Sequence, residues 1–183
     1  AHAVDWCLDA VRVMDLDTSR DYVWLPEKLT ACESLLDSSY KWIVFCPGAR
    51  WPSKCWPQDY FVRLAEKLRF MEGKLKIAIL GTAEDSDLGK VISAAAPDIC
   101  LDLVGKTTLV EMVECLRRAR VVVANDSGPL HLAVALNRPL VGLYGPTHSG
   151  RTGPYCRSSD IIQAEIPCAP CCLPHCENKI EME

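Results

Sequence analysis

The stretch from Val121 to Pro154 constrains the fold of this chain more than any other. It contains two short apolar runs, Val121–Ala124 and Leu140–Tyr144, and each is followed by small polar residues or glycine. An Ala- and Leu-rich segment at 130–136, with the composition of a helix, lies between them. This order predicts one βαβ unit with parallel strands. Because open α/β sheets bind ligands at the edge where such strands end, a site is expected there.

A polar turn at 125–129 follows the first of these strands and resembles a helix start. Asp126 or Ser127 is expected to cap the helix through a side-chain oxygen. Gly128 lets the backbone turn tightly and lets a ligand approach, and Pro129 suits the first helical turn. The free amides and the positive end of the helix dipole would then face the loop, which predicts a phosphate site. A capped helix without a ligand is the alternative.

Two histidines lie near this edge. His131 belongs to the first helical turns, and His148 follows the second strand. Their ordinary pKa suits an acid–base role. For His131, we favour the simpler interpretation that its side chain hydrogen-bonds its own helix end and orders the turn.

Strands and helices alternate over most of the remaining chain. The predicted strands are 42–46, 76–80 and 99–103, and the predicted helices are 58–70, 85–95 and one that begins after Thr108, where Glu111 completes a capping box. Apolar residues of the helix at 58–70 fall at i, i+3, i+4 and i+7, as on a helix that covers a sheet. The alternation predicts an α/β fold with a Rossmann-like parallel sheet and helices on both faces.

Loops 47–57, 125–131 and 145–154 are expected at the same sheet edge. Lys54 offers an ammonium group suited to a phosphate, and Thr147 lies among further hydrogen-bond donors. This local basic character suits a diphosphate, although a solvated surface lysine is the alternative for Lys54. Trp51 and Trp56 are expected to pack their loop against the helix at 58–70.

Three motifs occur in order between residues 42 and 176. They are PGARWPSKCWP at 47–57, GKTTL at 105–109, and DSGPLHLA at 126–133, the last followed by Pro139 and by YGPT at 144–147. Their order and spacing resemble the signature of glycosyltransferase family 9, the ADP-heptose:lipopolysaccharide heptosyltransferases and their relatives. The resemblance implies the C-terminal, donor-binding half of a GT-B glycosyltransferase.

The resemblance also implies a nucleotide sugar as the ligand of these loops. In the family, the lysine matching Lys54 contacts the diphosphate, and the residues matching 126–128 hold sugar and phosphate. Glu84 or Asp85 is expected to bind the ribose hydroxyls, because a carboxylate accepts both hydrogen bonds, and 106–109 to lie beside the base. The expected substrate-binding residues are Lys54, Glu84, Asp85, Thr107, Asp126, Ser127, Gly128, Pro129, His131 and Thr147.

Full-length enzymes of the resembled family transfer a heptose or related sugar from ADP-heptose to the lipopolysaccharide core, and no cofactor or metal is expected. Their catalytic base lies in an N-terminal domain, so the catalytic residues of this chain stay unassigned. The resemblance implies that this chain alone is inactive, and that the full-length protein contacts the acceptor and, peripherally, the membrane. The expected domains are an interdomain linker with the end of an N-terminal domain at 1–40, the nucleotide-sugar-binding domain at 41–165, and a truncated Cys-rich tail at 166–183.

Charge and hydropathy narrow the function classes. The formal net charge of −4 argues against a general nucleic-acid binder. No run approaches the roughly 20 apolar residues that span a bilayer, and the first residues lack the basic region and apolar core of a secretion signal. A cytoplasmic protein is therefore expected. Within 1–40, the sequence favours a helix at 3–14, an extended piece at 24–26 and a helix at 27–36.

Five of the 11 cysteines fall between residues 156 and 176. A C-x2-C pair followed by His175 and Cys176 could hold zinc, but all of these ligands lie within nine residues, and we favour a metal-free structural element. Cys46, Cys100 and Cys115 are expected to be small buried hydrophobes. Two alternatives to sugar transfer stay open: an epimerase-like GT-B domain for sugar nucleotides, and a non-catalytic metal or redox module built on the tail.

Overall fold

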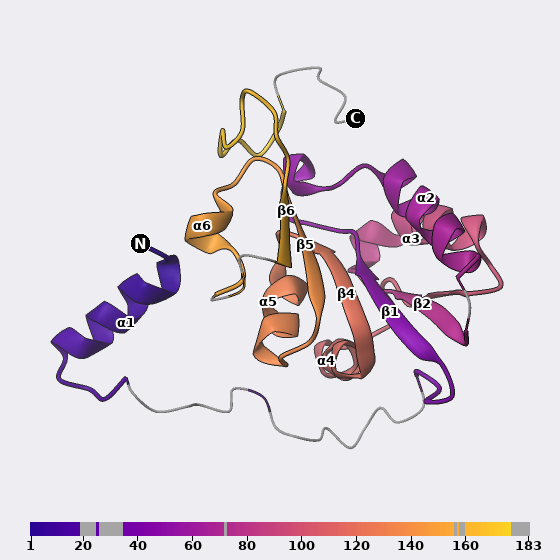
Figure 1. Ribbon diagram of the computed structural model, residues 1–183, viewed down its shortest axis with the longest axis horizontal. Coiled ribbons are helices and arrows are strands. Elements are labelled where there is room, and N and C mark those ends of the chain that lie inside the picture. Colours follow the sequence, from indigo (N-terminus) through magenta and orange to yellow (C-terminus); the bar gives the residue numbers. More distant parts are fainter. Residues whose placement is uncertain (19–24, 26–34, 72, 156, 158–159, 177–183) are drawn as a thin grey trace.

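A six-stranded parallel sheet forms the centre of the computed structural model, which describes residues 1–18, 25, 35–71, 73–155, 157 and 160–176 (Figure 1). Its strands lie in the order β3-β2-β1-β4-β5-β6. They are β1 (Lys41–Cys46), β2 (Leu75–Ile79), β3 (Cys100–Asp102), β4 (Ala119–Asn125), β5 (Leu140–Tyr144) and β6 (Ile161–Gln163). The chain order reverses between β1 and β4, which is where a doubly wound sheet opens a crevice for ligands.

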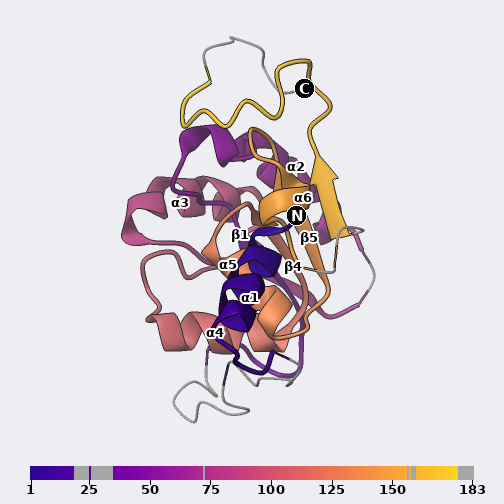
Figure 2. The same cartoon turned by 90° about the vertical axis from the view of Figure 1, so that its left-hand side faces the viewer.

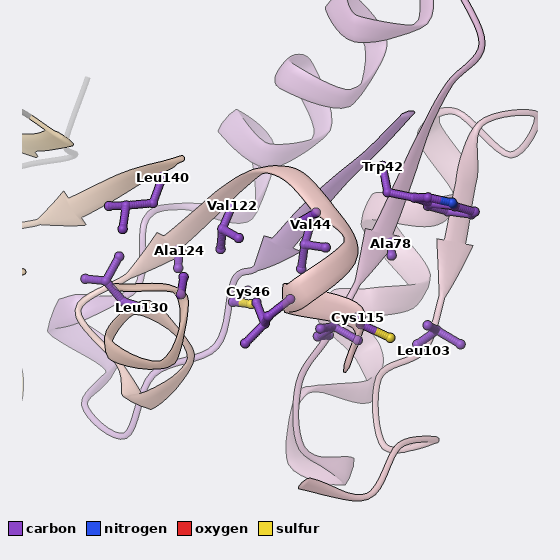
Figure 3. Close-up of a cluster of buried hydrophobic side chains, with 14 of the residues drawn as sticks. Trp42, Val44, Cys46, Ala78, Leu103, Cys115, Val122, Ala124, Leu130 and Leu140 are labelled. Atoms are coloured by element: carbon purple, nitrogen blue, oxygen red, sulfur yellow. The ribbon is translucent and has the colours of Figure 1, made fainter. Parts of the chain in front are cut away.

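Helices cover both faces of this sheet. On one face, α2 (Gln58–Arg69) and α3 (Ser86–Ala95) contribute to a core with Phe45 of β1. On the other, α4 (Leu109–Arg118) and α5 (Gly128–Ala135) pack over Val44 and Cys46 (Figure 3). Neighbours along β1 thus point to opposite faces, as the pleat of a strand requires. The predicted Rossmann-like architecture is confirmed.

The N-terminal helix lies beside a short helix near the end of the sheet. α1 (Ala3–Val13), predicted at 3–14, is next to α6 (Ser149–Thr152) in both views (Figures 1 and 2). The Nε2 atom of His2 lies 2.9 Å from the carbonyl oxygen of Gly153, and the Tyr155 hydroxyl donates to the Asp5 carboxylate at 2.6 Å. These bonds tie two segments that are about 150 residues apart in sequence.

Several local features differ from the sequence expectations. The structure adds β6, α6 and two 3₁₀ turns, η1 (Pro52–Lys54) and η2 (Ala83–Asp85), none of which was predicted. These elements are three or four residues long, too short to leave a periodic pattern. Most of the helix expected at 27–36 lies outside the described residues, and its described end, 35–36, is not helical. Of the extended piece expected at 24–26, only residue 25 is described.

The capping box predicted at Thr108 is present. Its hydroxyl accepts a hydrogen bond from the backbone N–H of Glu111, and the Glu111 carboxylate accepts one from the backbone N–H of Thr108 at 2.7 Å. The same bond lowers the pKa of Glu111. None of the helices in the described ranges is long and apolar enough to cross a bilayer.

Candidate functional site

A cavity of about 600 Å³ opens at the carboxyl edge of the sheet, beside the point where the strand order reverses. Loops that follow β1, β2, β3 and β4 line it together with α4. Its walls include five of the expected residues: Glu84, Asp85, Thr107, Ser127 and Pro129. Residues from four separate loops thus meet in one place, because the carboxyl ends of parallel strands lie at one edge.

Lys54, Asp126 and Thr147 form a cluster of charged and polar side chains, in which Asp126 directly precedes Ser127 of the cavity wall. Lys54 itself lines a separate, smaller cavity of about 180 Å³ beside β5 and β6. The Lys54 ammonium lies 2.7 Å from Oδ2 of Asp126, and the Thr147 hydroxyl donates to the same oxygen at 2.7 Å. The Lys54 ammonium also stands 4.7 Å from the centre of the Trp51 ring. The Lys54 side chain is 19% exposed, but that of Asp126 is only 6% exposed. A cation is therefore held at the helix start by a buried carboxylate.

The expected capping of α5 by Asp126 or Ser127 is wrong. Ser127 occupies the N-cap position, but its hydroxyl donates back to the carbonyl oxygen of Asn125 at 3.1 Å. Asp126 is engaged by Lys54 and Thr147 instead. Because no side chain caps this helix, the Gly128 N–H remains available to a ligand. Pro129 has no N–H, and the Leu130 N–H donates to the Ser127 carbonyl at 3.2 Å. Pro129 lies in that first turn as predicted.

A methyl group at Gly128 would meet no atom within 4 Å, so the space beside this residue is open. This openness, together with the uncapped helix start, leaves room for a phosphate to approach the backbone closely. The anion site predicted from the turn is thus sterically and electrostatically feasible in the structure.

Asn125 connects the Lys54 loop to the end of β4, a role that the sequence analysis did not identify. Its side chain is completely buried. Its Oδ1 atom accepts from the Trp56 backbone N–H at 3.1 Å, and its Nδ2 atom donates to the Pro47 carbonyl at 2.6 Å. The only hint in the sequence was an amide side chain at the last position of an otherwise apolar strand.

The two carboxylates proposed for the ribose differ in what they already contact. Oδ2 of Asp85 accepts from both the backbone N–H and the hydroxyl of Thr82, at 2.8 and 2.9 Å. Glu84 is exposed on the cavity rim and makes no hydrogen bond or ion pair within the described ranges. Thr107 also lines the cavity, whereas Lys106 turns away, because its ammonium binds Asp102.

His131 does not make the hydrogen bond expected to its own helix end. His131 is exposed, and its side chain forms no hydrogen bond to any described residue. Desolvation of part of its ring lowers the pKa of His131, and the negative charge of Asp126 opposes this effect. His148 is also exposed and lines another cavity, of about 450 Å³, between α1 and α6.

The expectation for the two loop tryptophans is confirmed for one of them. Trp56 stacks on Tyr60 of α2, with ring centres 5.2 Å apart, and meets Phe61 edge-on. Trp51 instead faces the Lys54 ammonium. Consequently Trp56 anchors the loop to the helix, and Trp51 contacts the charged group.

The Cys-rich tail lies against two loops of the site. The backbone N–H of Cys172 donates to the carbonyl of Pro146 at 2.7 Å, and the Ser53 hydroxyl donates to the carbonyl of Leu173 at 2.6 Å. Among the residues that the structure describes, no three His, Cys, Asp or Glu side chains are grouped as metal ligands. The metal-free interpretation of the tail stays a prediction.

Comparisons with known proteins identify a family for this arrangement. The model of glycosyltransferase family 9 (heptosyltransferase) matches residues 10–180. Lipooligosaccharide heptosyltransferase 2 of Haemophilus influenzae is 42% identical over 126 residues, which cover 66% of this chain and 36% of that protein. Lipopolysaccharide heptosyltransferase 2 of Escherichia coli is 36% identical over 143 residues, covering 75% of this chain and 40% of that protein.

Solved structures show the same likeness. The structure of E. coli ADP-heptose lipopolysaccharide heptosyltransferase II superposes with a TM-score of 0.63 at 36% identity, covering 70% of this chain and 39% of that one. The structure of E. coli heptosyltransferase WaaC with ADP gives a TM-score of 0.61 at 25% identity, covering 71% and 39%. The chain therefore spans less than half the length of these relatives.

Proposed function

Because this chain belongs to glycosyltransferase family 9, we propose that it is the donor-binding part of an enzyme that transfers a heptose or related sugar from ADP-heptose to the lipopolysaccharide core. The named relatives are heptosyltransferases, which favours sugar transfer over an epimerase-like domain or a metal or redox module. The relative whose structure was solved with ADP supports an adenine nucleotide as the leaving group of the donor.

The observation that carries this proposal is that Ser127 and Pro129, at the uncapped start of α5, line the 600 Å³ cavity, while the preceding residue Asp126 holds the Lys54 ammonium. In the proposed complex the nucleoside occupies the cavity, where Glu84 or Asp85 accepts the ribose hydroxyls and Thr107 lies near the base. The diphosphate then lies along the Ser127–Gly128 backbone, within reach of Lys54. Its negative charges meet backbone amides and one cation, which favours binding.

These groups also suit the chemistry of transfer. An acceptor hydroxyl attacks the anomeric carbon of the sugar, and the bond from that carbon to the diphosphate oxygen breaks. ADP leaves with the electron pair, and the hydroxyl proton passes to a base that lies outside the residues assigned here. Negative charge develops on the departing diphosphate, so Lys54 and the Gly128 N–H at the start of α5 stabilise the transition state more than the ground state.

Asp126 has a separate role in this proposal. Before the donor binds, it neutralises Lys54 and orders the loop through Thr147. When a diphosphate arrives, the ammonium turns toward phosphate oxygens, and the carboxylate accepts hydrogen bonds from sugar hydroxyls in its place. The acceptor is bound by a further domain of the full-length protein, which works in the cytoplasm with peripheral membrane contact.

A titration of this chain with ADP tests the proposal. We expect calorimetry to show saturable binding, and Lys54→Ala to weaken it by about 10- to 100-fold, because a charge-assisted contact contributes about 1.5–3 kcal/mol. Lys67→Ala removes the same charge in the last turn of α2 and serves as the matched control, with unchanged affinity. Absence of ADP binding by the unmodified chain would contradict the function. Equal affinities of the Lys54 and Lys67 variants would contradict only the role of Lys54.

A further inference from the structure

A single buried side chain fixes both ends of the loop that carries Lys54. Asn125, the last residue of β4, uses its carbonyl oxygen for the Trp56 N–H and its amide nitrogen for the Pro47 carbonyl. Pro47 directly follows β1, and Trp56 lies just before α2. The two hydrogen bonds therefore hold both ends of segment 47–56 against the same side chain. Lys54 lies two residues before the Trp56 end of this segment.

The amide group is the side chain that this arrangement requires. The Trp56 N–H is a donor and the Pro47 carbonyl is an acceptor. The side-chain amide of asparagine matches both, because its oxygen accepts and its NH₂ group donates. An aspartate would place a second oxygen against the Pro47 carbonyl, and an alanine would leave a backbone N–H and a carbonyl without these partners. Because the Asn125 side chain is completely buried, loss of either bond is costly.

Asn125 also links the loop to the other half of the ion pair. The next residue along the chain is Asp126, whose carboxylate holds the Lys54 ammonium at 2.7 Å. Asn125, which holds the two ends of segment 47–56, and Asp126, which binds Lys54, are therefore neighbours on the same stretch of backbone. Lys54 has a long, rotatable side chain, so its position depends on where its backbone is held.

We propose that Asn125 is a positioning residue for the donor site, which acts on the diphosphate only through Lys54. This rests on the proposed function, because it assumes that Lys54 contacts the diphosphate. Asn125 itself touches no ligand in this proposal. It holds segment 47–56 so that the ammonium needs little further ordering when the donor binds, and preorganisation of this kind contributes affinity.

A double-mutant cycle with ADP as the probe tests the proposal on the full 183-residue chain. Asn125→Ala should weaken ADP binding about tenfold in the unmodified background, the equivalent of one lost contact. In the Lys54→Ala background the same change should weaken binding by less than about twofold, because the coupled partner is already gone. Leu140→Ala controls for general destabilisation, since Leu140 is buried at the start of β5, away from the loop; it should leave ADP affinity unchanged.

Amide hydrogen exchange of the unmodified chain supplies a second test that needs no variant. The Trp56 backbone N–H should exchange far more slowly than the exposed loop amides, because Asn125 accepts its hydrogen bond. If Asn125→Ala does not fold, Asn125→Ser takes its place in the cycle, and the exchange measurement stands independently.

The possible outcomes separate the inference from the function on which it rests. Equal losses in both Lys54 backgrounds, unchanged ADP affinity in folded Asn125 variants, or a rapidly exchanging Trp56 amide would overturn the positioning role alone. Failure of the unmodified chain to bind ADP would overturn the proposed function as well.

Discussion

Replacing Asp126 by asparagine tests whether this carboxylate competes with the donor's diphosphate for Lys54 while binding its sugar. At the observed 2.7 Å separation, two unit charges attract each other by about 6 kcal/mol at an effective dielectric constant of 20. Desolvation of the buried carboxylate offsets most of this attraction. Asparagine keeps the shape and an oxygen that can accept from Thr147 and Lys54, so only the charge-assisted part of two hydrogen bonds is lost.

We therefore expect Asp126→Asn to lower the free energy of unfolding by about 1–2 kcal/mol. For a chain of this size, that corresponds to a fall in melting temperature of about 2–8 °C. The Lys54 side chain can turn into solvent, because it is 19% exposed, so the penalty stays below the 3–5 kcal/mol that a fully buried orphan charge would cost.

The effect on binding should depend on the ligand. Free ADP no longer has to displace a carboxylate from Lys54, so its affinity should be equal or up to about fivefold higher in the variant. ADP-heptose should bind about tenfold more weakly, because the sugar hydroxyls lose a charged acceptor. The assay is a paired calorimetric titration of both ligands against both proteins. Equal losses for ADP and ADP-heptose would refute the reasoning and show that Asp126 only shapes the turn.

Two further predictions concern Gly48, which lines the 600 Å³ cavity, and the buried thiol of Cys46. Gly48→Ala should lower the free energy of unfolding by about 1–3 kcal/mol and weaken ADP binding. The reason is that the new methyl carbon would lie 2.5 Å from Oδ1 of Asp85. An unchanged melting temperature would contradict this prediction. Cys46 should resist iodoacetamide in the native chain up to pH 9, while the exposed Cys171 reacts. The reason is that burial raises the pKa of Cys46 to about 12, and iodoacetamide reacts with the thiolate. Peptide mapping by mass spectrometry measures both rates, and similar labelling of the two thiols would refute the assignment.

The sequence alone determined the architecture and much of the site. Apolar runs that alternate with amphipathic segments predict a parallel sheet with helices on both faces, because burial on each face must match the period of the element. The sequence also predicted the capping box at Thr108, because its two residues are only three positions apart. The polar turn that contains Ser127 was expected at the carboxyl edge of the sheet from the pattern of strands and helices, whereas Glu84, Asp85 and Thr107 were expected beside the ligand only from the resemblance to glycosyltransferase family 9.

Contacts between distant residues could be decided only by the tertiary structure. Asp126 was expected to cap its own helix, but it pairs with Lys54, 72 positions earlier in the sequence. The expectation that it faces a sugar stays a prediction. Asn125 gave no periodic signal, yet its two bonds cross 69 and 78 residues of chain. Whether a polar side chain bonds a local or a distant partner depends on which of them the folded sheet brings within hydrogen-bonding distance. That outcome depends on the packing of the whole domain, which local sequence patterns do not encode.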